Sequence, residues 1–284
     1  MSALQQPRAN VGLRITAADI ARLAKIADRE SGIELGADKA DFLNSRLSRI
    51  VEAKGLADFA AYCSYLESRN SADVREFVEA ITTHTTSFFR ERGQFDWLQA
   101  EGFEALYATG AGKTRDLVIW SAASSTGQEL YSAMICAQST AKTLAPLRYR
   151  GVGTDISTKV VAEAKRGIYM RPEITGIPAE IRPDCLLSSK SNDGRYRIVP
   201  ELRNKIDWRV GSLTNAATLQ NIDADVAFLR NVLIYFDDET QIKVIRNVLS
   251  RIRPGGYLLT GHSETSHARA LDLEVIKPTI YRKA

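Results

Sequence analysis

From about residue 95 onward, apolar and β-branched runs alternate with stretches of helical character, and this pattern limits the possible folds most strongly. The runs 116–121 ("DLVIWS"), 149–157 ("YRGVGTDIS") and 224–236 ("ADVAFLRNVLIYF") are each followed by a segment with apolar residues at helical spacing. Such alternation is typical of a mostly parallel sheet with helices on both faces. We therefore predict an α/β domain over residues 95–284, ending in a strand pair around Pro278.

The first part of the chain has a different pattern and predicts a small all-helical domain. The segment 16–32 begins with Thr16 as a helix N-cap, repeats apolar residues at helical spacing and ends at Gly32. Three further segments of the same kind follow. We expect residues 1–80 to form this domain and residues 81–94 to link it to the α/β domain.

The alternation is interrupted at about residues 172–207. An Asn-Asp-Gly turn and a short alternating strand predict a small β-subdomain inserted there. Residues 165–210 carry 10 Lys and Arg against 6 Asp and Glu, which accounts for the whole net charge of +4. Because dense basic runs with interleaved aromatic residues are missing, we expect an acidic protein partner here and no nucleic acid.

Composition argues against disulfide frameworks, metal sites and membrane spans. Cys63, Cys136 and Cys185 are widely spaced and odd in number, and the histidines have no companions at ligand spacing, so we predict neither a disulfide framework nor a metal site. No window approaches the roughly 18 apolar residues of a membrane span, and the first residues do not resemble a signal peptide. We expect a cytoplasmic protein without membrane insertion.

A loop of small residues, 121–127 ("SAASSTG"), follows the first strand of the α/β domain. In an open parallel sheet, ligands bind beyond the carboxyl ends of the strands. The loop contains a single glycine, Gly127, whereas a pyrophosphate needs several bare amides at a helix N-terminus. A nucleoside without phosphates, such as S-adenosylmethionine, therefore suits the loop better than a dinucleotide.

Two acidic residues stand where that ligand needs them. Asp155 ends the second predicted strand and could accept hydrogen bonds from the ribose hydroxyls, while Glu129 begins the helix after the loop and favours a cationic ligand. The alternative is that Asp155 only caps the following helix and that Glu129 only offsets the dipole of its own helix. The residues alone leave both interpretations open.

Three longer stretches carry a resemblance to a known family. They are 82–91 ("TTHTTSFFRE"), 120–132 ("WSAASSTGQELYS") and 228–237 ("FLRNVLIYFD"), the last followed by "PGGYLLTGHSE". In this order they closely resemble the chemotaxis receptor methyltransferases, the CheR family. The resemblance implies a Rossmann-like class I methyltransferase sheet and transfer of a methyl group from S-adenosylmethionine to receptor glutamates, with S-adenosylhomocysteine as the product.

The same resemblance implies roles for individual residues. Glu129 should hold the amino end of the cofactor, Asp155 its ribose, and Ser212 and Leu213 should lie near the adenine. The other implied cofactor contacts are His84, Thr86, Arg90, Arg230 and Asn231. His84 stands where the family usually has Asn.

The expected chemistry needs few catalytic groups. A glutamate carboxylate is ionised at neutral pH, so it can attack a methyl group on sulfur without a general base. Arg90 could orient the incoming carboxylate through a forked contact, or form a structural ion pair. Tyr235 could line the path of the methyl group, or simply pack. Arg90 and Tyr235 are therefore the candidate catalytic residues.

Substrate contacts are expected on two basic surfaces. The stripe of Lys39, Arg46 and Arg49 could dock the acidic helices of a receptor, or be an ordinary solvated face. The β-subdomain could bind the C-terminal peptide of a receptor by strand addition. Two other functions stay open. One is a methyltransferase of the same fold that acts on another signalling protein. The other is a non-catalytic adaptor, which is considered because His84 replaces the usual Asn.

Overall fold

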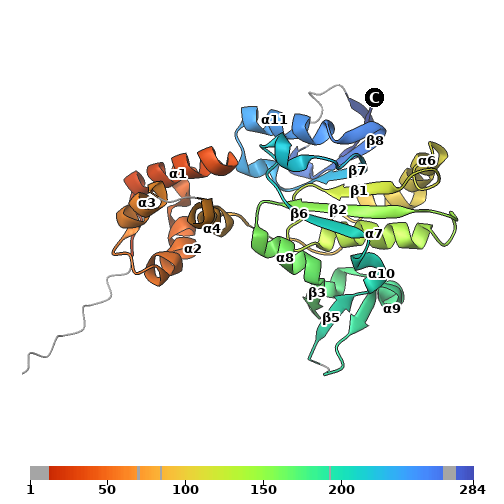
Figure 1. Ribbon diagram of the computed structural model, residues 1–284, viewed down its shortest axis with the longest axis horizontal. Coiled ribbons are helices and arrows are strands. Elements are labelled where there is room, and N and C mark those ends of the chain that lie inside the picture. The colour runs from red at the N-terminus through yellow and green to blue at the C-terminus, as the bar shows by residue number, and fades with distance from the viewer. Residues whose placement is uncertain (1–12, 69–70, 84, 192, 265–272) are drawn as a thin grey trace, which may run out of the picture. The chain divides into compact units, whose positions relative to one another are not determined.

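A computed structural model gives the structure of the chain and describes residues 13–68, 71–83, 85–191, 193–264 and 273–284. The chain divides into two compact units, Met1–Thr83 and His84–Ala284. The first unit contains the helices drawn in red to brown in Figure 1, and the second contains all of the strands.

The first unit is all-helical, as predicted. Its helices are α1 (Ala17–Ser31), α2 (Ala40–Ala53), α3 (Phe59–Glu67) and α4 (Ser71–Ile81), with a 3-10 turn η1 (Ala37–Lys39) before α2. Thr16 caps α1 through a reciprocal pair of hydrogen bonds with Asp19, and Gly32 ends the helix at φ 74°, where a side chain would be strained. The apolar faces of the four helices form the core of the unit, which includes Leu23, Leu43, Leu47, Val51, Phe59 and Phe77.

The second unit is built on a seven-stranded sheet with the order β6-β2-β1-β7-β8-β10-β9. Its strands are β1 (Leu117–Ser121), β2 (Tyr149–Asp155), β6 (Ile206–Val210), β7 (Ala224–Leu229), β8 (Ile252–Thr260), β9 (Leu273–Lys277) and β10 (Ile280–Lys283). The first five strands in that order are parallel, and β10 pairs antiparallel with both β8 and β9. The predicted α/β fold and the final strand pair are thus confirmed.

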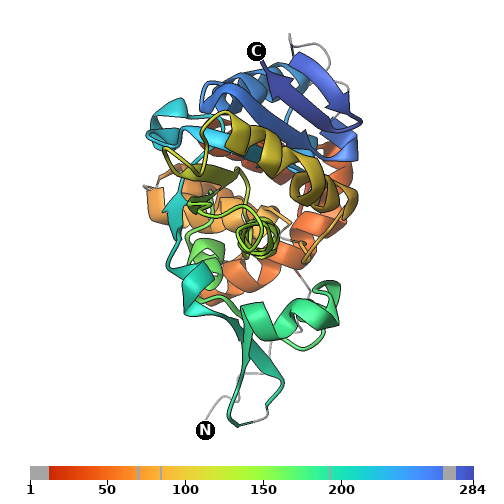
Figure 2. The same ribbon diagram turned by 90° about the vertical axis from the view of Figure 1, so that its right-hand side faces the viewer.

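Helices cover both faces of the large sheet. The helix α7 (Gln128–Thr140) joins β1 to β2, α8 (Thr158–Arg166) follows β2, and α11 (Asp238–Leu249) joins β7 to β8. Because parallel crossovers are right-handed and these run in opposite directions from the middle of the sheet, α7 and α11 lie on opposite faces. The continuous segment α5 (Gly93–Trp97), η2 (Leu98–Gly102) and α6 (Phe103–Ala108) packs beside α7 (Figure 2).

A second, three-stranded sheet has the antiparallel order β3-β5-β4. It consists of β3 (Ile168–Met170), β4 (Leu186–Ser188) and β5 (Arg195–Ile198), and it extends away from the large sheet in both views (Figures 1 and 2). The turns η3 (Glu173–Gly176) and η4 (Ala179–Ile181) and the short helices α9 (Arg182–Cys185) and α10 (Pro200–Arg203) adjoin it. The insertion was expected at about 172–207. The small sheet begins earlier, at Ile168, and the chain returns to the large sheet at Ile206.

None of the helices in the part of the chain that the structure describes is both long enough and apolar enough to cross a membrane.

Candidate cofactor site

The small-residue loop lies at the carboxyl end of β1, between β2 and β7. Its backbone is fixed from both sides, because Ala122 N–H donates to Phe228 O at 2.9 Å and Ser124 N–H donates to Thr154 O at 2.9 Å. Gly127 ends the loop at φ 97°. A Cβ atom at this position would lie 3.0 Å from Trp208, so both conformation and space require glycine.

Asp155 braces this loop from the end of β2. Its Oδ2 accepts from Ser125 N–H at 2.8 Å and its Oδ1 accepts from Ser157 N–H at 3.0 Å. The N-cap of α8 is Ser157, whose hydroxyl accepts from Val160 N–H. The alternative interpretation of Asp155 as the helix cap is therefore wrong, and its carboxylate instead lies between the loop and the start of the helix.

Ser212 and Leu213 follow β6 on the neighbouring side of Asp155. Gly211 N–H donates to Asp155 O at 2.9 Å, which brings this turn beside the end of β2. Leu213 is buried, and its carbonyl accepts from Asn247 Nδ2 of α11. The two residues therefore lie beside the end of β2, at the same edge of the sheet as Asp155.

A buried cluster of charges lies on the other side of the loop. Arg230 follows β7, and its side chain is only 1% exposed. Its Nη1 donates to Glu129 Oε2 at 3.0 Å, and its Nη2 lies 3.3 Å from Glu91 Oε2. Ser121 Oγ donates to Glu129 Oε1 at 2.7 Å. Two carboxylates thus share one guanidinium, so the cluster has a net charge of −1 when both are ionised, and its side chains are at most 19% exposed.

The environment of Glu129 shifts its titration. Burial raises the pKa of this carboxyl above its ordinary value, whereas Arg230 and the hydrogen bond from Ser121 oppose the rise. The negative charge of Glu91 adds to the rise. A cation bound beside Glu129 would lower its pKa again, so the site favours a positively charged ligand.

The segment after residue 84 lies against this cluster. Arg230 Nη2 donates to Arg90 O at 2.6 Å, and Phe89 N–H donates to Ser132 Oγ of α7 at 2.9 Å. Thr86 and Arg90 are half-buried, and Arg90 Nη1 donates to Thr85 O at 3.1 Å. His84 lies outside the described residues.

A second turn follows β7 directly after Arg230. Asn231 has φ 56°, and the 3-10 turn η6 (Leu233–Tyr235) follows it and ends at the half-buried Tyr235. The buried Glu264, in the turn η7 (His262–Glu264) after β8, accepts from Val232 N–H at 3.2 Å. The Glu264 carboxylate therefore anchors the backbone of the turn that carries Asn231 and Tyr235.

Three polar residues of this arrangement were not predicted: Glu91, Ser121 and Glu264. All three lie within the quoted stretches. Glu91 and Glu264 contact residues far from them in the chain, whereas Ser121 contacts Glu129 only eight positions along. Among the described residues, no group of three or more His, Cys, Asp and Glu side chains is placed to hold a metal ion.

The basic residues expected to dock a substrate lie in the helical unit. Arg46 and Arg49 are exposed on α2, and Arg46 stacks over the Phe42 ring at 5.4 Å. Lys39 is exposed in η1, before α2 begins, and its ammonium lies 3.5 Å from Asp38.

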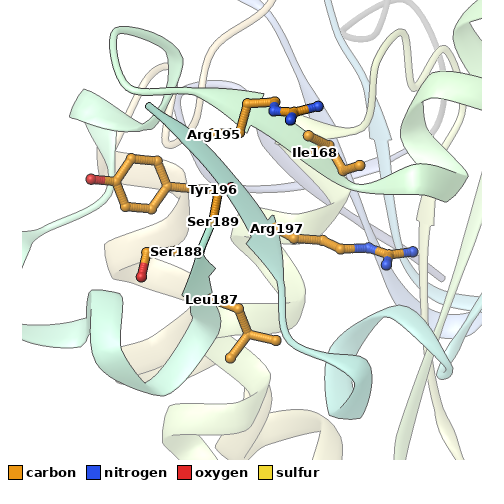
Figure 3. A pocket seen from close by; sticks show the side chains of 7 residues that line it. All are labelled: Ile168, Leu187, Ser188, Ser189, Arg195, Tyr196 and Arg197. Carbon is orange, nitrogen blue, oxygen red and sulfur yellow. The ribbon is translucent and has the colours of Figure 1, made fainter. Parts of the chain in front are cut away.

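The three-stranded sheet carries an open pocket of about 250 Å³ (Figure 3). Ile168, Arg197 and Leu187 are cross-strand neighbours in one row. Ile168 is 42% exposed and Leu187 50%, so the row joins apolar surface to a cation. The pocket is lined by Ile168, Leu187, Ser188, Ser189, Arg195, Tyr196 and Arg197.

Two models of one protein family match successive parts of the chain. Residues 18–82 match the family model "CheR methyltransferase, all-alpha domain", and residues 84–281 match "CheR methyltransferase, SAM binding domain". The chain is 34% identical over 277 residues to "Chemotaxis protein methyltransferase 2" of Pseudomonas aeruginosa, covering 97% of this chain and 96% of the relative.

Two other relatives span the chain to a similar extent. The "Chemotaxis protein methyltransferase" of Salmonella typhimurium is 32% identical over 271 residues, covering 95% of this chain and 91% of the relative. That of Borreliella burgdorferi is 31% identical over 281 residues, covering 98% of each chain. The chain therefore belongs to the CheR methyltransferase family, and S-adenosylmethionine is its cofactor.

Proposed function

We propose that this protein transfers the methyl group of S-adenosylmethionine to glutamate side chains on the cytoplasmic helices of chemoreceptors, and that it acts in the cytoplasm. One observation carries the proposal most strongly. A buried cluster with a net charge of −1 lies beside the small-residue loop, in a chain whose relatives along almost their whole length are chemotaxis protein methyltransferases.

The residues at the strand ends fit the parts of the cofactor. Glu129 suits the cationic amino end, because its carboxylate is buried and only partly neutralised by Arg230. Asp155 suits the ribose hydroxyls, and Ser212 and Leu213 suit the adenine. We assign the remaining contacts to His84, Thr86, Arg90, Arg230 and Asn231.

The cofactor, when bound, would supply an electrophilic methyl group on a sulfonium, and its transfer to a substrate carboxylate oxygen would give a methyl ester and S-adenosylhomocysteine. The protein does not need to remove a proton, because the attacking carboxylate is already ionised. Its task is to align the carboxylate with the methyl group and to exclude water.

Arg90 and Tyr235 are the proposed groups for this alignment. Arg230 donates to the backbone carbonyl of Arg90, which keeps this segment beside the proposed cofactor site. We expect Arg90→Ala to abolish methyl transfer while the affinity for the cofactor falls less. Radiolabelled methyl transfer and calorimetric titration would measure the two effects, and near-normal turnover in the variant would remove Arg90 from the mechanism.

We further propose that Lys39, Arg46 and Arg49 dock the acidic helices of the receptor. Reversing two charges, Arg46→Glu with Arg49→Glu, should slow receptor methylation and leave cofactor affinity unchanged. Arg75→Glu is a matched control, because Arg75 is exposed on another helix of the same unit. Equal methylation rates in the double variant and the control would show that the stripe does not dock the receptor.

For the three-stranded sheet we propose binding of a receptor's C-terminal peptide. The exposed row of Ile168, Arg197 and Leu187 suits a peptide with both apolar and acidic side chains, added along a sheet edge. Arg197→Glu should weaken binding of such a peptide in a fluorescence anisotropy titration. Unchanged binding would show that the pocket does not recognise the peptide.

The first test of the whole proposal is calorimetric titration with S-adenosylmethionine, S-adenosylhomocysteine and NADH, followed by a receptor methylation assay. Binding of the two sulfur ligands and transfer to receptor glutamates are expected. Binding without transfer would indicate another signalling protein as the substrate. Failure to bind either sulfur ligand would favour a non-catalytic adaptor.

A further inference from the structure

We infer that Glu91 is a positioning residue for the cofactor's amino end: it shares the Arg230 guanidinium with Glu129, so that the cluster offers a surplus negative charge to an ammonium group beside Glu129. This inference rests on the proposed placement of the cofactor's amino end at Glu129. Glu91 would then affect recognition of the α-amino acid group of the ligand and would not affect recognition of the adenosine.

The contacts of Arg230 show how its guanidinium is shared between Glu129 and Glu91. Its Nη1 faces Glu129 Oε2 at 3.0 Å, while its Nη2 lies 3.3 Å from Glu91 Oε2 and also donates to Arg90 O. Among the described residues, Glu91 Oε2 has no hydrogen-bond donor, although the atom is buried. A carboxylate oxygen placed this way acts through its charge on Arg230.

The balance of charge explains why a second carboxylate is needed. A lone pair of Arg230 and Glu129 would be neutral and would offer little attraction to a cation. With Glu91 present, the guanidinium is shared and the cluster keeps a net charge of −1 in a site of low exposure, where charges interact more strongly than in water. That surplus charge is complementary to one ammonium group.

The backbone of the segment is shaped to deliver this side chain. Phe89 has φ 54° and Glu91 has φ 58°, in the left-handed region that residues other than glycine rarely adopt. Two such residues within three positions persist because their surroundings hold them, and strain of this kind concentrates at functional sites. Phe89 N–H is held by Ser132, and Arg90 O is held by Arg230.

The experiment compares two ligands that differ only in the part that Glu91 is inferred to serve. S-adenosylhomocysteine carries the amino acid group, and 5′-methylthioadenosine lacks it. Calorimetric titration of the full chain with Glu91→Gln should show about tenfold weaker binding of S-adenosylhomocysteine, the size of a lost charge-assisted contact, and unchanged binding of 5′-methylthioadenosine. Glu91→Asp, which keeps the charge, should recover part of the loss.

Two variants make the result specific. Glu104→Gln removes an exposed carboxylate from α6 and should change neither affinity. Glu129→Gln should itself lose S-adenosylhomocysteine selectively, which tests the placement of the amino end. An equal loss of both ligands in Glu91→Gln, or no loss of either, would overturn the inference. Failure of the wild-type protein to bind S-adenosylhomocysteine would instead overturn the proposed function.

Discussion

Replacing Arg230 by Met should destabilise the second unit in a way that depends on pH. The substitution removes a guanidinium that is 1% exposed and leaves the carboxylates of Glu129 and Glu91, which are 14% and 19% exposed, without their shared cation. Removing one partner of a buried ion pair typically costs about 3–5 kcal/mol. Because the two carboxylates retain some exposure, we expect the lower end, about 3 kcal/mol.

That loss can be followed in the second unit alone. The three tryptophans of the chain, Trp97, Trp120 and Trp208, all lie in it, so their fluorescence reports its unfolding and not that of the helical unit. For a unit of this size, a loss of about 3 kcal/mol corresponds to a fall in Tm of about 6–12 °C. Arg92→Met is the control, since the Arg92 side chain is 57% exposed and should contribute little.

The sign of the pH dependence follows from Glu129. Its pKa is already raised by burial, and losing Arg230 removes a group that lowers it. A carboxyl whose pKa is higher in the folded state stabilises the fold when protonated, and this contribution is lost as the pH rises through the folded-state pKa. The difference in Tm between variant and wild type should therefore be larger at pH 8 than at pH 5.5. An equal or smaller difference at pH 8 would refute the reasoning.

Three further outcomes are expected. Gly127→Ala should lower the free energy of unfolding by about 1–3 kcal/mol in a denaturant titration, because φ is 97° and the added Cβ would lie 3.0 Å from Trp208. Asp155→Asn should weaken binding of S-adenosylhomocysteine by about 1.5–3 kcal/mol, since Ser125 N–H loses a charged acceptor along with the ribose; calorimetry would measure it. Cofactor affinity should fall as the pH drops through the raised pKa of Glu129, because only the ionised carboxylate attracts an ammonium group; titrations at several pH values would show a flat profile if Glu129 does not contact it.

The parts of the fold that follow from local pattern were predictable. The strands β1, β2 and β7 are largely buried, and the residues that end or follow them, such as Asp155 and Glu129, could be assigned to a site because strand ends meet at one edge of the sheet. The strand β6 was not predicted, because this edge strand, "IDWRV", alternates polar with apolar residues and is largely half-exposed.

The partnership of Glu91 with Arg230 was beyond the reach of local pattern. A glutamate that follows an arginine in a polar stretch has many possible partners, and periodicity does not choose among them. The choice depends on the left-handed backbone at Phe89 and Glu91 and on the depth at which Arg230 is buried. Neither the backbone conformation nor the burial of Arg230 can be predicted from the local sequence, because both arise from tertiary packing.

The cofactor site is discontinuous in the chain, and this affects how the protein gains its activity during synthesis. Glu129 and Arg230 are 101 residues apart, and the contact between Arg230 and the carbonyl of Arg90 spans 140 residues. A growing chain therefore lacks the Arg230 cluster until β7 has left the ribosome and paired with β1, a late event in a sheet of parallel strands. Chains truncated before residue 230 should consequently pass through an immobilised S-adenosylhomocysteine resin that retains the full chain.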